Sequence, residues 1–70
     1  MRLKQLSYFA AIVENGSFSA AAKDLYIAQS SLSSSIAALE QELGFPLLVR
    51  TRSGVTPTDM GAIIYRDIKD

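Results

Sequence analysis

Apolar side chains recur with helical spacing through the middle of the chain, between residues 29 and 43. At intervals of four, three and four positions stand Leu32, Ile36, Leu39 and Leu43. At about 100° per residue these side chains share one stripe of a helix. The opposite side is small, uncharged and rich in hydroxyl groups: Ser30, Ser33, Ser34 and Ala37, with Gln29 and Ser31 on its shoulders. The pattern predicts a helix over residues 29–43 with one buried face and one smooth polar face.

The N-terminal stretch predicts a first amphipathic helix over residues 3–14. Its apolar positions recur at threes and fours: Leu3, Leu6, Phe9, Ala10, Ile12 and Val13. Lys4, Ser7 and Glu14 fall on the outward side of this helix. Gly16 follows as a stop signal, because glycine readily adopts the left-handed backbone that closes a helix.

A short second helix is predicted over residues 18–25. Ser17 is a good N-cap for this helix, and its inner face comprises Phe18, Ala21, Ala22 and Leu25. Residues 26–28 form the turn that follows, where we expect Ile27 to fill the gap between two helices. Residues 18–37 therefore predict a helix–turn–helix.

The rest of the chain predicts a two-stranded β wing and a fourth helix. Gly44 ends the central helix, and residues 47–50 are apolar and β-branched enough for a strand. Residues 51–54 have turn chemistry. Residues 55–57 return as a second strand, which ends in a proline that cannot donate to a ladder. Thr58 caps the fourth helix, whose apolar positions are Met60, Ile63, Ile64 and Ile68.

These elements predict a mainly α fold of winged helix–turn–helix type. It comprises a three-helix core, a two-stranded β wing and the start of a fourth helix. We assign residues 1–58 to the winged helix–turn–helix domain and residues 59–70 to the start of the fourth helix, which has no stop signal. We therefore expect this helix to be truncated by the chain end and to fray unless it packs against a neighbour.

Composition narrows the functional classes. The chain of 70 residues has no cysteine and no histidine, which removes disulfides, thiolate metal ligands and the commonest general base. Serines are plentiful, but no base is present to activate one, so an enzyme is a poor interpretation. We expect no metal and no cofactor. Because no apolar run approaches the roughly 20 residues of a membrane span and no signal-peptide pattern is present, we expect a cytoplasmic protein without membrane contact.

The charge balance counts against a nucleic-acid partner. Seven basic and seven acidic residues give a net charge of zero, whereas a domain that binds nucleic acid is expected to be basic. The distribution softens this objection, because Arg50 and Arg52 lie together and no acid occurs between positions 43 and 58. Glu40 and Glu42 fall late in the central helix, away from its serine-rich end.

The serine-rich face nevertheless suits the major groove of DNA. A recognition helix reads base edges with its N-terminal turns, glutamine pairs with adenine, and serine pairs with several bases. We predict that the residues facing the bases are Gln29, Ser30, Ser31, Ser33 and Ser34. Ser17 and Ser19 are expected near phosphates at the helix starts. Arg50 and Arg52 of the wing would reach phosphate or the minor groove. Taken singly, the serines also fit a solvated helix face and the arginines a solvated hairpin; their combination favours DNA.

Five short motifs run in order along nearly the whole chain. They are Leu3-x-Gln5-Leu6-x-x-Phe9, Gly16-Ser17-Phe18-Ser19-x-Ala21-Ala22-x-x-Leu25, Gln29-x-x-Leu32-Ser33-x-x-Ile36-x-x-Leu39-Glu40-x-x-Leu43-Gly44, Leu47-x-x-Arg50 and Thr58-x-x-Gly61. In residue type and spacing they resemble the N-terminal winged helix–turn–helix domain of LysR-type transcriptional regulators. The resemblance implies a bacterial transcription factor that binds double-stranded DNA and is associated with the nucleoid.

The same resemblance carries expectations about assembly. It implies a full-length parent that binds DNA as a homodimer, often as two dimers together, with a larger C-terminal domain that binds a small-molecule inducer. That domain is missing from this sequence, so we expect a fragment. Residues 59–70 would begin a linker helix that pairs with its mate in the parent. The fragment alone is expected to be monomeric or weakly paired.

Several positions depart from the pattern of the family. The family usually has serine at the position of Ala28 and proline at that of Ser30, and it often has arginine or glutamine at those of Ser34 and Ser35. Fewer cations should weaken DNA binding and flatten its salt dependence. The zero net charge and the uncharged helix leave an alternative: a helix–turn–helix-derived protein-interaction module that no longer binds DNA strongly.

Overall fold

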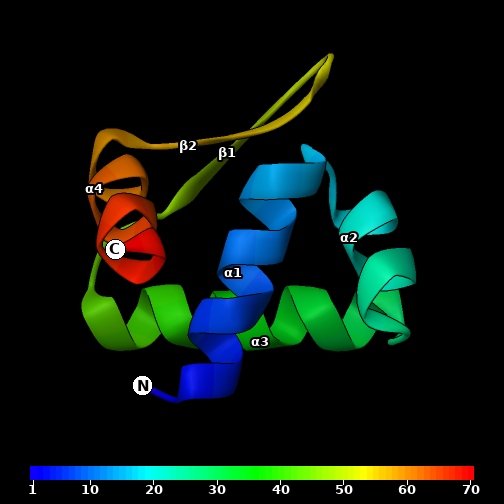
Figure 1. Ribbon diagram of the computed structural model, residues 1–70, viewed down its shortest axis with the longest axis horizontal. Coiled ribbons are helices and arrows are strands. Elements are labelled where there is room, and N and C mark those ends of the chain that lie inside the picture. Colours follow the sequence, from blue (N-terminus) through cyan, green and yellow to red (C-terminus); the bar gives the residue numbers. More distant parts are fainter.

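Three helices surround the core in a computed structural model that describes residues 1–70 (Figure 1). They are α1 (Leu3–Asn15), α2 (Phe18–Leu25) and α3 (Gln29–Leu43). α1 crosses in front of α3, and α2 stands to the right of α1 in the same view. The predicted helix–turn–helix is confirmed, and the serine-rich stretch is helical from its first residue.

The core is formed by the apolar stripes that the spacing predicted. All eleven buried hydrophobic residues belong to one cluster: Phe9, Ala11, Ile12, Phe18, Ala21, Ala22, Leu32, Ile36, Leu39, Leu47 and Val55. The stripe of α3 lies at its centre, because Leu32 and Leu39 are fully buried, whereas Leu43 at the helix end is only partly buried. Leu3 was expected on the apolar side of α1, but it is exposed at the first position of that helix.

The helix ends follow from local chemistry. Gly16 and Gly44 close α1 and α3 in the left-handed region, with φ of 75° and 85°, as the sequence predicted. The Ser17 hydroxyl oxygen accepts the Ala20 N–H at 2.9 Å and so caps α2. Ala28 provides no such bond for α3. The start of the central helix therefore depends on packing rather than on a side-chain cap.

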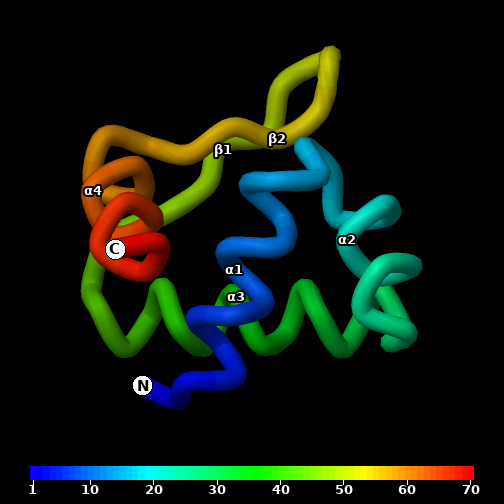
Figure 2. The backbone as a smooth tube through the Cα atoms, in the orientation of Figure 1, coloured from blue at the N-terminus to red at the C-terminus, as the bar shows by residue number.

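The wing is an antiparallel hairpin of β1 (Leu48–Thr51) and β2 (Gly54–Pro57). The first strand starts one residue later than predicted, at Leu48; Leu47 just before it is buried, and its carbonyl oxygen accepts the Thr58 N–H at 2.9 Å. The predicted four-residue turn shrinks to two residues, because Thr51 pairs with Gly54. The hairpin extends above the helices in Figure 2, with its tip at the top of the view and the N-terminus at the bottom.

The fourth helix, α4 (Asp59–Lys69), begins at Thr58, whose hydroxyl oxygen accepts the Gly61 N–H at 3.0 Å. The apolar side predicted for this helix is confirmed only in part. Ile64 and Ile68 pack against the core, but Met60 and Ile63 are exposed. The reason is that Gly61 is buried against the backbone of Leu47, the residue before β1, and this close contact turns Met60 and Ile63 toward solvent.

A polar cluster ties the last turns of α4 to α1. The Tyr65 hydroxyl donates to the Glu14 carboxylate at 2.8 Å, and the Lys69 ammonium lies 3.1 Å from the same oxygen. The hydrogen bond from Tyr65, with that from Lys69, lowers the pKa of Glu14, and the same contacts raise the pKa of Tyr65 and of Lys69. The end of α4 thus has a neighbour within the chain.

None of the helices is both long and apolar enough to cross a membrane.

Candidate nucleic-acid interface

The exposed face of α3 is a smooth surface of small polar side chains. Ser30, Ser31 and Ser34 are exposed, as is Gln29 at the first position of the helix, while Ser33 is partly buried. Nothing bulky or charged stands among them. Because short side chains keep a helix surface low, the backbone of these turns can approach a flat or concave partner closely. The serines are thus available at the surface, as the sequence predicted.

A groove next to this face gathers residues from three elements. It has a volume of about 280 Å³ and is lined by Ser17, Phe18, Ser19, Gln29, Arg50, Thr51, Arg52, Gly54 and Val55. Five of the nine predicted site residues therefore meet in one place, although they are spread over 36 positions of the chain (17 to 52). Their donors surround one concave surface between the start of α2, the start of α3 and the wing.

Arg50 is held in a defined position on the wing. Its guanidinium carbon lies 4.1 Å from the centroid of the Phe18 ring at the start of α2. A guanidinium that packs its flat face on an aromatic ring keeps the N–H groups at its edge free to donate hydrogen bonds. Arg50 is exposed despite this contact. The arrangement orients one cation beside the serine-rich face without neutralising it.

The wing itself is anchored at the turn between α1 and α2. The Val55 N–H donates to the Gly16 carbonyl oxygen at 2.9 Å. Gly54, with φ of 136°, lies so close to Gly16 that a Cβ atom at this position would overlap the same carbonyl oxygen. This backbone contact fixes the distance between the hairpin and the helix–turn–helix, and it sets the position of both wing arginines.

Glu40 has a structural role that the sequence did not reveal. It lines a smaller groove of about 160 Å³ that also contains Ser33 and Arg50, so this acid is closer to the serine-rich face than its position late in α3 suggested. Its carboxylate accepts the N–H groups of Leu47 and Leu48, at 2.6 and 3.2 Å. The negative charge is thus used to hold the start of the wing.

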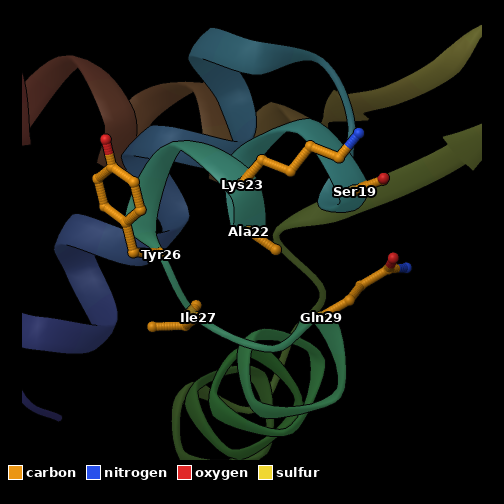
Figure 3. Close-up of a pocket in the computed structure, with 6 residues that line it drawn as sticks. All are labelled: Ser19, Ala22, Lys23, Tyr26, Ile27 and Gln29. Carbon is orange, nitrogen blue, oxygen red and sulfur yellow. The ribbon is translucent and has the colours of Figure 1, made fainter.

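Lys23 is a candidate contact that the pattern missed. It lines a groove with Ser19, Tyr26 and Gln29, among others. Figure 3 shows the polar ends of Lys23, Ser19 and Gln29 directed to the same side, whereas the Tyr26 ring points the opposite way. The residue lies on the second helix, where a lysine also fits an ordinary solvated surface. Only the crossing of α2 over the start of α3 indicates that it borders the site.

Two further cations flank α3 on the side away from the wing. Arg2 and Lys4, at the start of α1, line a groove of about 280 Å³ together with Gln5, Tyr8, Ser31 and Ser35. Together with Lys23, Arg50 and Arg52, they make five of the seven basic side chains. All five border the start of α2 or the serine-rich turns of α3. The neutral total charge therefore conceals an uneven distribution of the basic side chains, most of which lie near the serine-rich face.

Comparison with known proteins agrees with this geometry. The profile of the bacterial regulatory helix–turn–helix proteins of the lysR family matches residues 3–62. The nitrogen assimilation regulatory protein nac of Escherichia coli (strain K12) is 52% identical over 65 residues, which are 93% of this chain and 21% of that protein. The HTH-type transcriptional regulator ClcR of Pseudomonas putida is 42% identical over 69 residues, or 99% of this chain and 24% of its own length.

Solved structures give the same result. The crystal structure of the BenM_DBD/benA site 1 DNA complex has a TM-score of 0.93 and 47% identity, and covers 99% of this chain and 81% of that one. The CbnR_DBD-DNA complex has a TM-score of 0.92 and 38% identity, and covers 99% and 79%.

The chain belongs to the LysR family of bacterial regulators, and its fold is the winged helix–turn–helix of that family's DNA-binding domains. It spans about a fifth of the length of the curated relatives it matches, 21% for nac. The relatives are transcriptional regulators by name. The predicted fold class and family are therefore confirmed.

Proposed function

We propose that this domain binds double-stranded DNA sequence-specifically by inserting the first turns of α3 into the major groove. The observation that carries the proposal is the shared groove, in which Gln29 of α3 meets Arg50 and Arg52 of the wing. A helix start with short polar side chains suits base edges, and the arginines beside it suit phosphates. The DNA complexes of the BenM and CbnR domains, at 47% and 38% identity, support the same use of this fold.

The residues divide by the kind of contact their chemistry favours. Gln29 would read adenine through two hydrogen bonds, and the serines would accept from or donate to base edges; these are Ser30, Ser31, Ser33 and Ser34. Ser19 and the free hydroxyl proton of Ser17 would donate to phosphate, together with the N–H groups at the start of α2. Arg50 and Arg52 would bind phosphate or enter the minor groove.

The proposal extends to the larger protein in three respects. The domain would act as residues 1–58 of a transcription regulator in the bacterial cytoplasm, with α4 as the start of a linker helix. The regulator would bind DNA as a homodimer or tetramer, and a further domain would bind a small-molecule inducer. The isolated domain would be monomeric or weakly paired. The names of the curated relatives as regulators support this.

The wing arginines provide the test. We expect the double variant Arg50→Ala/Arg52→Ala to bind a consensus duplex, selected from a randomised pool with the wild-type domain, at least about tenfold more weakly, because each charge-assisted hydrogen bond contributes roughly 1.5–3 kcal/mol. Fluorescence anisotropy at low salt measures the difference. The single variant Arg50→Lys should retain only part of the wild-type affinity, because lysine keeps the charge but loses the stack on Phe18.

The matched control removes the same charge elsewhere. Arg66→Ala/Lys69→Ala on α4 should leave the affinity within about twofold, because distant exposed charges are screened over roughly 10 Å. Selection that returns no consensus, or a wing variant that binds as well as wild type, would contradict the proposed mode of binding. A domain that bound no duplex at all would favour the protein-interaction module instead.

A further inference from the structure

We propose that Arg2 and Lys4 at the start of α1 bind the phosphate backbone on the edge of the major groove opposite the wing. The inference rests on the proposed insertion of α3 into that groove and adds a second set of phosphate contacts to it. Arg2 and Lys4 are both exposed, and the groove they line includes Ser31 and Ser35 of α3.

The position of the two cations relative to α3 carries the argument. Ser33 lies in the groove shared with Arg50, whereas Ser31 lies in the groove shared with Arg2 and Lys4. At about 100° per residue, positions 31 and 33 lie roughly 160° apart around the helix axis, with position 34 between them on the exposed face. In Figure 1 the wing lies above α3 and the N-terminus below it. The two basic groups therefore stand on opposite flanks of one helix.

Duplex geometry fits this arrangement. The major groove is about 12 Å wide, so a helix within it has a phosphate chain on each side. A helix flanked by cations on one side only would contact one of these chains. Here the wing arginines face one flank, and Arg2 and Lys4 face the other. No acidic side chain lines the groove of the second flank.

The second flank is also held in place. The Gln5 side-chain amide donates to the Ser35 carbonyl oxygen at 3.4 Å, which ties the first turn of α1 to α3. The Gln5 amide oxygen accepts the Arg2 N–H at 2.9 Å, and the Lys4 ammonium lies 5.8 Å from the centroid of the Tyr8 ring. The cations therefore project from a backbone whose position relative to the recognition helix is fixed.

Salt dependence distinguishes phosphate contacts from structural effects. We expect Arg2→Ala/Lys4→Ala to reduce the slope of log Kobs against log salt by about 1.8, because each phosphate contact contributes about 0.9. Between about 50 and 200 mM salt, the affinity gap between wild type and variant should then narrow roughly tenfold. The probe is a fluorescein-labelled duplex of mixed sequence, because phosphate contacts are sequence-independent, and the readout is anisotropy.

Two companion variants make the outcome decisive. Arg2→Lys/Lys4→Arg keeps both charges and should retain the wild-type slope, and Arg66→Ala/Lys69→Ala removes two charges on α4 and should retain it too. An unchanged slope for Arg2→Ala/Lys4→Ala would overturn this inference alone, provided that the wing variant lowers the slope. An equal loss for the α4 variant would also overturn it. If neither the wing nor the α1 variant changes the slope, the proposed function fails as well.

Discussion

Ser34→Glu is expected to lower the affinity of the domain for its selected duplex by at least about 100-fold. Ser34 is exposed, and helical spacing places it between Ser31 and Ser33, which line the grooves of the two basic flanks of α3. A carboxylate there would face phosphates and base-edge acceptors, and opposed like charges cost several kcal/mol in a closely packed interface. Glutamate has a higher helix propensity than serine, so the helix itself should not be weakened. Anisotropy measures the loss, and circular dichroism checks the fold.

Two controls distinguish the effect of a negative charge at position 34 from the effects of side-chain size and of the net charge of the domain. Ser34→Gln adds a side chain of similar size without charge and should bind far better than Ser34→Glu. Ala62→Glu adds the same charge on the exposed side of α4 and should leave the affinity nearly unchanged. Wild-type affinity in Ser34→Glu would show that this face does not enter the groove.

Gly61→Ala is expected to destabilise the domain by roughly 2–4 kcal/mol, although alanine ordinarily stabilises a helix by about 1 kcal/mol relative to glycine. A Cβ atom on Gly61 would overlap the Leu47 carbonyl oxygen and lie 3.0 Å from the carbonyl carbon. Leu47 cannot move away freely, because its side chain is fully buried and its carbonyl oxygen also accepts the Thr58 N–H.

This loss is large relative to the total free energy of unfolding, because the domain is small. Chains of this length have roughly 0.05–0.15 kcal/mol of stability per residue, so the loss is a large share of the total. Thermal denaturation should show a midpoint lowered by at least about 10 °C. Ala62→Gly is the matched control and should cost only about 1 kcal/mol. A Gly61→Ala variant as stable as wild type would mean that Gly61 does not pack closely against the Leu47 backbone.

The sequence was sufficient for the elements because their signals are local. The spacing of Leu32, Ile36 and Leu39 determines the buried face of α3, and the caps at Ser17 and Thr58 involve partners three residues away. The glycines that end α1 and α3 bond to carbonyl groups only four residues back. Such features need no knowledge of how helices cross, and all of them are present in the structure.

The parts that the sequence did not predict depend on contacts between distant segments. Glu40 holds two N–H groups across the turn after α3, and nothing in its neighbourhood indicates this role. Met60 and Ile63 satisfy the apolar period of α4 but are exposed, because Gly61 sets the rotation of that helix. Arg2 and Lys4 become neighbours of Ser31 only through the crossing of α1 over α3.

Amide chemical-shift mapping with the selected duplex is the most direct test of the central claim that the hydroxyl-bearing face of α3 is the DNA-contacting surface. The proposed mode predicts the largest shifts at residues 29–34, with further shifts at Arg50 and Arg52 and little change over residues 59–70. No shifts at millimolar concentrations, or shifts confined to α4, would contradict it.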